Sequence, residues 1–152
     1  MNIEIRTPTA KDMRYLATHL RDQDQAELSA SHGDNYHQVI KDSVQHSSEV
    51  WALLVDGRLM FIAGVGEVSL LSSTGSPWLL GTTLIVKHPK VFLSYTRKII
   101  KDMQKTHQTL VNFVDVRNTV AIRYLKHMGF TLYDAVPYGR LKKLFYPFDM
   151  VT

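Results

Sequence analysis

One stretch near the C-terminus decides the fold of this chain: Val114-Asp115-Val116-Arg117-Asn118-Thr119-Val120-Ala121-Ile122-Arg123-Tyr124-Leu125-Lys126-His127-Met128-Gly129-Phe130. The apolar run over 110–116 predicts a buried strand, and the apolar spacing over 119–128 predicts a helix. Asn118 stands where an N-cap side chain satisfies free amides of the first helical turn. Gly129 can adopt the left-handed conformation that ends a helix, which lets Phe130 seal the helix against a sheet. The stretch therefore predicts a strand followed by a helix with both ends specified.

The rest of the chain alternates strand and helix patterns around this unit. Pro89 favours a helix start, Asp56-Gly57 favours a hairpin turn, and Thr9 is the expected N-cap of the first helix. The remaining patterns predict strands over 2–6, 49–55, 58–65 or beyond, and 78–86, helices over 10–21, 24–30, 36–46 and 89–106, a loop over 72–77, and two final strands around 137–139. This order predicts an α/β (α+β) fold, with a mixed, mostly antiparallel sheet flanked by helices.

Composition limits the functions that the chain can have. Its 152 residues, 45% hydrophobic and 21% charged, predict one domain over 1–152. The absence of cysteine excludes thiol nucleophiles, and the seven histidines form no close pair, so we expect no metal site. No apolar run is long enough to span a membrane, and we expect a cytoplasmic protein. The net charge of +4 suits an anionic partner but also suits an ordinary solvated surface.

The stretch quoted above resembles the last conserved motif of the GNAT acetyltransferases. In that family an asparagine caps the helix, an alanine follows three residues later, and the helix closes on Gly-Phe. Asn118, Ala121, Gly129 and Phe130 keep this spacing. The strand order upstream also matches, so the resemblance covers nearly the whole chain. It implies a GNAT-like fold and acetyl-CoA as the acyl donor.

A narrower resemblance concerns three shorter segments. They are similar to a group of GNAT-like proteins encoded by short-tailed bacteriophages, and they read Leu20-Arg21-Asp22 with Glu27-Leu28, Trp78-Leu79-Leu80-Gly81-Thr82, and Arg123-Tyr124-Leu125-Lys126. This similarity implies action in an infected bacterial cytoplasm, with a host or phage protein as the target or partner.

The resemblance also implies where acetyl-CoA binds. The family holds the pantetheine arm on the first of two splayed strands, which corresponds here to 83–86, and holds the pyrophosphate on the loop and helix that follow. The implied cofactor-binding residues are Leu84, Ile85, Val86, Lys90, Ser94, Arg97 and Asn118. The chain departs from the family because no glycine occurs between Thr82 and Met128, and bulky Leu93 and Tyr95 stand where small residues are expected. The cations at 90 and 97 either replace backbone amides or only form the wet face of an amphipathic helix.

The catalytic candidates are Glu67, Asp115 and Tyr124. Glu67 is the chosen general base because it lies toward the end of a central strand, while Glu27 and His88 are further candidates. Many relatives place a tyrosine seven residues after the capping asparagine, where it is the general acid for the leaving thiolate. This chain has Leu125 at that position. Tyr124 is one residue away, which turns its side chain by about 100° on a helix. Asp115 either acts chemically or positions the turn at Asn118.

Three functions remain open. The first is an acetyl-CoA-dependent N-acyltransferase, and the second is a catalytically impaired GNAT-fold module that binds a host or phage protein. The third is nucleic-acid contact through the basic helix over 89–106, which we expect least because no stacking motif accompanies it. The altered phosphate loop separates the first two, since a module does not need to bind acetyl-CoA.

Overall fold

A single eight-stranded sheet organises the computed structural model, which describes residues 1–152. The strand order is β1-β2-β3-β4-β5-β8-β6, with β7 on the other part of β8, and only β4 and β5 run parallel. The expected mixed, mostly antiparallel sheet is confirmed. The strands are β1 Ile3–Arg6, β2 Ser47–Val55, β3 Arg58–Ser69, β4 Thr74–Gly81, β5 Thr109–Asp115, β6 Thr131–Leu132, β7 Val136–Tyr138 and β8 Lys143–Val151.

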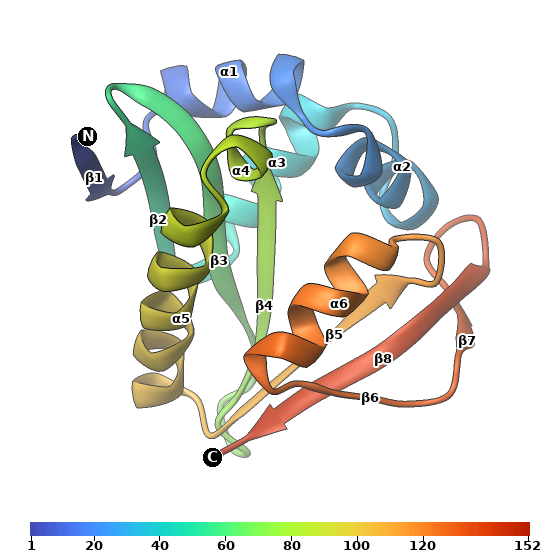
Figure 1. Ribbon diagram of the computed structural model, residues 1–152. Coiled ribbons are helices and arrows are strands. Elements are labelled where there is room, and N and C mark those ends of the chain that lie inside the picture. The colour runs from blue at the N-terminus through green and yellow to red at the C-terminus, as the bar shows by residue number, and fades with distance from the viewer.

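Helices cover both faces of the sheet (Figure 1). Two of them, α5 and α6, lie in front of the sheet in this view, while α1 and α3 pack behind it and α2 lies at its upper end. None of the helices is long and apolar enough to cross a lipid bilayer. The bounds are α1 Ala10–His19, α2 Asp22–Ser31, α3 Tyr36–Gln45, α4 Leu84–Lys87, α5 Pro89–Thr106 and α6 Thr119–Met128.

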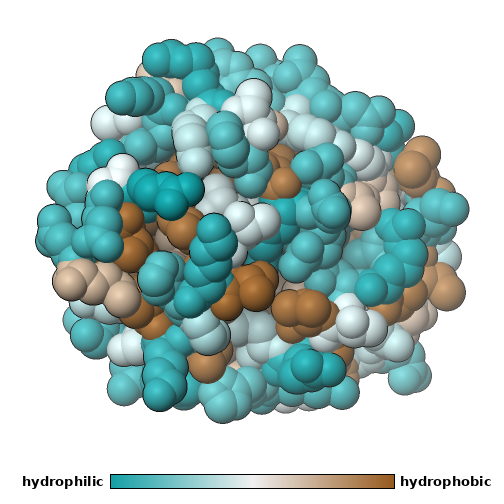
Figure 2. Space-filling view, turned by 45° about the horizontal axis from the view of Figure 1, so that its top comes forward, coloured by the Kyte–Doolittle hydropathy of each residue, from teal (hydrophilic) through white to brown (hydrophobic).

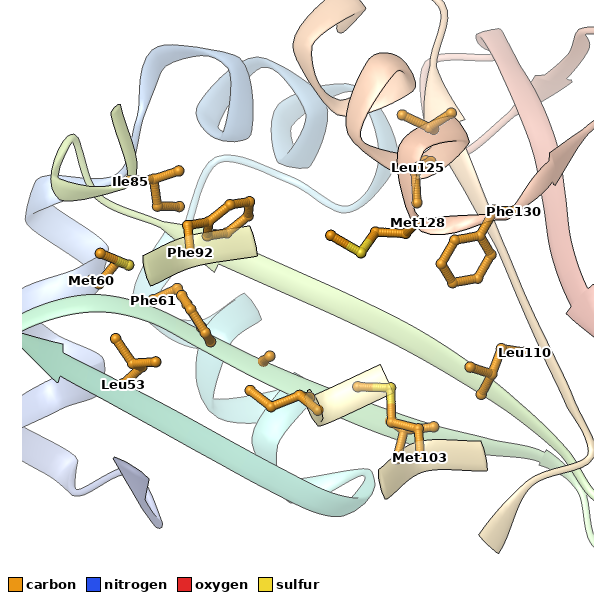
Figure 3. Packing of buried hydrophobic residues seen from close by; sticks show 14 of the residues in the cluster. Leu53, Met60, Phe61, Ile85, Phe92, Met103, Leu110, Leu125, Met128 and Phe130 are labelled. Atoms are coloured by element: carbon orange, nitrogen blue, oxygen red, sulfur yellow. The ribbon is translucent and has the colours of Figure 1, made fainter. Parts of the chain in front are cut away.

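The strands bury alternate side chains in two separate cores, one on each face of the sheet. The front core, under α5 and α6, includes Leu53, Met60, Phe61, Ile85, Phe92, Met103, Leu110, Leu125, Met128 and Phe130 (Figure 3). The core behind the sheet joins α1, α2 and α3 to β2, β3 and β4 through Leu16, Leu20, Leu28, Ile40, Ala52, Leu54, Leu59, Ile62 and Leu80.

Helix ends follow the local sequence signals. Thr9 caps α1 in a capping box with Asp12, and the Asn118 side chain accepts the Ala121 N–H at the start of α6. Gly129 ends α6 with φ of 101°, in the left-handed region where a side chain would be strained. These three predictions are confirmed.

The bounds predicted for the strand over 78–86 are wrong at both ends. β4 begins at Thr74, inside the expected loop, because residues 74–77 pair with β3. It ends at Gly81, and Leu84–Lys87 forms the short helix α4. Thr82 turns the chain, since its N–H and hydroxyl both donate to the Met60 carbonyl. Ile85 then packs against Gly81, where an added Cβ would lie 2.2 Å from the Ile85 side chain.

β4 and β5 pair only at their first residues and then diverge (Figure 1). The register holds Thr74 beside Thr109 and Gly75 beside Leu110, and no further pair follows. Just above, the Asn112 side chain bridges the two strands: its Nδ2 donates to the Pro77 carbonyl at 2.7 Å, and its Oδ1 accepts the Phe113 N–H at 2.8 Å. One amide side chain thus replaces the backbone ladder where the split begins.

The upper end of the split is fastened by α2. The Asp24 carboxylate accepts the Gly81 N–H at 2.9 Å and pairs with the Arg21 guanidinium at 3.0 Å. Arg21 also donates its backbone N–H to the Gly81 carbonyl at 3.0 Å. Both side chains of this pair are at least nine-tenths buried, so neither is free to find water if the other is removed.

We expect Asp24→Ala to lower the free energy of unfolding by about 3–5 kcal/mol, because it leaves a buried guanidinium and a buried N–H without partners. The matched control is Asp102→Ala, which breaks the other i,i+3 pair, with Lys105, on the exposed face of α5. That variant should stay within about 0.5 kcal/mol of wild type. Urea denaturation measures both, and equal losses would show that Asp24 does not fasten α2 to β4.

Candidate active site

A groove of about 640 Å³ occupies the split between β4 and β5. Its 34 lining residues come from α2, β3, β4, α4, α5, β5, α6, β7 and β8 and the turns beside them, and about two-thirds of them, 22, are hydrophobic. Figure 2, which brings the top of Figure 1 forward, shows apolar residues set among hydrophilic ones on this face. An apolar cleft with a few convergent polar groups is the usual form of a small-molecule site.

The edge of β4 that faces the split keeps one residue with free backbone groups. Gly81 directs its N–H and C=O to α2, and Pro77 has no N–H and gives its carbonyl to Asn112. Because backbone groups alternate along a strand, Leu79 between them faces the same way. Its N–H and C=O are therefore available to a ligand that lies along β4.

Glu27 of α2 reaches the facing strand. Its Oε1 accepts the Asp115 N–H at 2.6 Å, and its Oε2 lies 3.4 Å from the Asn118 Nδ2. Burial raises the pKa of the Glu27 carboxyl from 4.5 to about 7, and the negative charges of Asp24 and Asp115 add to this. The carboxylate lines the groove, so it is placed and tuned to take a proton near neutral pH.

Tyr124 of α6 lines the groove from the opposite side. Its ring packs against Phe92, with centroids 5.1 Å apart, and burial raises the pKa of its phenol to about 12. The phenol therefore stays protonated at neutral pH. Leu125, at the position that the motif reserves for tyrosine, is buried and also lines the groove.

The structure does not bring the side chains of Glu67 and Asp115 to the groove. Glu67 lies toward the far end of β3, where its Oε1 contacts the buried His107 Nε2 at 2.6 Å. Glu67 pairs with Gly75, at the level where β4 and β5 are still joined, so it lies away from the open part of the split. The Asp115 carboxylate is turned to the Arg117 guanidinium, which lowers the pKa of that carboxyl against the opposing effect of burial. Of the four carboxylate and histidine candidates, Glu27 is the one that lines the groove.

The residues expected to pair with the pantetheine arm are not in a strand. Leu84, Ile85 and Val86 belong to α4, which is a correction to their expected backbone role. The reason is local: Leu84 and Ile85 are both buried, and a helical turn places adjacent apolar residues in the front core where a strand would expose one of them. Ile85 and Val86 still line the groove through their side chains.

A basic hollow of about 390 Å³ lies on the outer surface between α5 and α6, lined by Leu93, Ser94, Arg97, Lys98, Lys101 and His127. The Arg97 Nη2 lies 3.3 Å from the His127 Nε2, which joins the two helices across the hollow. Of the other expected cofactor residues, Lys90 lies in neither cavity, and Asn118 lines the main groove while it caps α6.

The hairpin between β7 and β8 covers the α2 end of the groove. Gly139, with φ of 78°, lies against α2 so closely that an added Cβ would come within 2.6 Å of the Ser31 Cα. Tyr138, which lines the groove, stacks on Phe113 at 4.0 Å between ring centroids. The two final strands were expected on either side of 137–139, whereas Pro137 and Tyr138 belong to β7 and the turn begins at Gly139. Nothing in the sequence showed that this turn docks on α2.

We expect Glu27→Gln to stabilise the protein increasingly as the pH rises from about 5 to 8. The folded-state pKa of Glu27 lies above its unfolded value, so wild type loses stability as the pH rises through about 7. Glutamine keeps an oxygen for the Asp115 N–H but cannot ionise, and the gain at pH 8 should be on the order of 3 kcal/mol. Urea denaturation at both pH values tests this. Glu4→Gln on β1 controls for the lost charge, and a pH-independent difference for Glu27→Gln would contradict the assignment.

No protein-family model matches the sequence, and no curated protein matches it either. Solved structures do match the fold. An acetyltransferase of the GNAT family from Bacillus anthracis superposes with a TM-score of 0.73 at 11% identity, covering 99% of this chain and 95% of that one. A mutant of the spermidine N-acetyltransferase SpeG from Vibrio cholerae gives a TM-score of 0.71 at 10% identity, covering 98% and 93%.

A ribosomal-protein-alanine N-acetyltransferase from Brucella melitensis gives a TM-score of 0.68 at 11% identity, covering 98% of this chain and 99% of that one. These likenesses run over the whole chain, at identities where fold persists without fixing function. The chain has the GNAT fold.

Proposed function

We propose that this protein is an acetyl-CoA-dependent N-acyltransferase. The observation that carries the proposal is Glu27, a carboxylate whose pKa of about 7 places it between protonated and ionised at neutral pH, beside the split of the sheet. The GNAT fold and the free backbone of Leu79 support it. Bound acetyl-CoA supplies an acetyl group activated as a thioester.

In this proposal, three residues of the groove, Leu79, Glu27 and Tyr124, each assist a different step of the acyl transfer. Leu79 offers an N–H to the thioester carbonyl, and ionised Glu27 accepts the proton that the attacking amine must lose. Tyr124, with a pKa of about 12, is a weaker acid than a thiol of pKa about 8.5. It therefore stabilises the departing thiolate by a hydrogen bond and keeps its proton.

For the phosphates of the donor, we propose the basic hollow. The expected pyrophosphate loop has no glycine and its residues from Pro89 onward belong to α5, so the backbone offers no glycine cradle. Arg97, Lys98 and Lys101 supply cationic side chains on the outer surface beside the groove instead. On the narrower resemblance to phage-encoded proteins, we further propose an amine of a host or phage protein as the acceptor.

We expect wild type to bind acetyl-CoA in the micromolar range and Arg97→Glu to bind it at least tenfold more weakly, because a charge-assisted contact becomes repulsive. Isothermal calorimetry at two salt concentrations measures both, and higher salt should reduce the difference. Lys41→Glu, which reverses an exposed charge on α3, is the matched control and should bind like wild type. Equal affinity for Arg97→Glu would remove the hollow from the donor site.

We expect the rate of CoA release in an acceptor-amine screen to rise with pH through about 7, as Glu27 ionises. Glu27→Gln should lower the rate by about 10²–10⁴-fold and abolish that pH dependence, since a positioned base contributes on this scale. Tyr124→Phe should lower turnover without weakening acetyl-CoA binding. A Glu27→Gln variant with an unchanged pH profile would exclude Glu27 as the base.

The second candidate is a binding module that has given up catalysis. The specific observation in its favour is that the expected pyrophosphate loop has no glycine and that its residues from Pro89 onward already belong to α5, with Leu93 and Tyr95 where small residues are expected. A module predicts no heat on titration with acetyl-CoA while the fold stays intact, together with a stable host or phage protein partner recovered with or without CoA.

A further inference from the structure

The groove is longer on its apolar side than an acetyl group requires. Along α5 its lining residues recur at helical spacing: Phe92, Leu93, Thr96, Ile99, Ile100 and Met103. Eleven residue steps separate the first from the last, which corresponds to roughly 16 Å at the rise of an α-helix. An acetyl group carries a single methyl beyond its carbonyl, so the acyl end of acetyl-CoA can contact only a small part of this wall.

The wall along α5 has no side-chain polar group that needs a hydrogen-bond partner from a ligand. Thr96 is its one polar side chain, and the Thr96 hydroxyl already donates to the Phe92 carbonyl at 2.7 Å. No buried side-chain nitrogen or oxygen in the protein lacks a hydrogen-bond partner. Cavities lined this way favour apolar occupants over water.

The opposite wall is aromatic and the floor has a small residue. Phe130, after α6, and Phe148 of β8 pack edge to face at 5.2 Å and both line the groove. On β3, the groove is lined by Ala63, whose neighbours on the same face of the strand are the larger Phe61 and Val65. Flexible Met103 and Met128 flank the region seen in Figure 3, and methionine adapts readily to an added chain.

We propose that the groove takes an acyl-CoA with a medium-length alkyl chain in preference to acetyl-CoA, with the chain lying between α5 and the Phe130–Phe148 wall. This inference rests on the proposed function and names its donor class. In the transfer, the acyl C–S bond breaks and an amide C–N bond forms. The amine proton passes to Glu27 and then to solvent, and CoA leaves as the thiolate beside Tyr124.

Calorimetry with free CoA, acetyl-CoA, butanoyl-CoA and octanoyl-CoA tests the chain-length preference without any acceptor. Each fully buried methylene strengthens binding by about fourfold, so burial of only two of the six extra methylenes makes octanoyl-CoA more than tenfold tighter than acetyl-CoA. Equal affinities for the three acyl-CoAs would overturn the inference and leave the proposed function standing. Failure of every CoA compound to bind would overturn the proposed function and this inference with it.

Two variants, one that narrows the groove and one that widens it, test where the alkyl chain of the donor lies. Ala63→Leu places a larger side chain at the β3 side of the groove and should reduce the ratio of the octanoyl-CoA affinity to the acetyl-CoA affinity at least fivefold. Ile99→Ala removes side-chain volume from the α5 wall and should shift the preferred acyl chain to a longer one. Ala10→Leu, at the exposed start of α1, is the control for the added side chain. Thermal unfolding confirms that each variant is folded. A ratio unchanged in both folded variants would place the chain elsewhere and refute this assignment.

Discussion

The divergence of β4 from β5 is the constraint on which the rest of the structure depends. Two parallel strands that separate leave backbone groups without partners, and buried backbone groups need partners. Three side chains meet this demand: Asn112 at the base of the split, and Asp24 and Glu27 at its upper end. The two carboxylates stand three residues apart on α2, so one helix face reaches both strands. The groove exists because this fastening holds the split open without filling it.

The same fastening couples stability to the proposed chemistry. Glu27 holds the Asp115 N–H as a structural acceptor, and the burial that this position imposes raises its pKa to about 7. A carboxylate with that pKa destabilises the folded protein at neutral pH relative to a neutral side chain. An isolated structural acceptor would gain from being glutamine or asparagine, as Asn112 shows at the other end of the split. In the proposed function, glutamate at position 27 accepts the amine proton, which a glutamine at this position could not do.

Sequence reasoning succeeded where the cause is local and failed where it is not. Thr9, Asn118 and Gly129 specify helix ends through atoms within four residues of themselves, so their roles can be read from the sequence. The end of β4 depends instead on Thr82, whose N–H and hydroxyl donate to the Met60 carbonyl 22 residues earlier in the chain. Glu67 was preferred over Glu27 on strand position alone, because neither the contact of Glu67 with His107 nor the docking of α2 leaves a local signal. The partners of these two carboxylates are 40 or more residues away along the chain.

The altered phosphate loop and the long apolar wall have a common consequence in the proposed function. Backbone amides at a glycine loop are fixed donors, whereas Arg97 and Lys101 lie on the surface, where salt screens them and side-chain entropy opposes their ordering. A donor held mainly by such side chains gains less from its phosphates than one held in a backbone cradle. The burial of alkyl carbon is insensitive to screening and grows with chain length. In the proposed function, a protein without the glycine cradle and with an apolar groove would therefore select its donor by the acyl end.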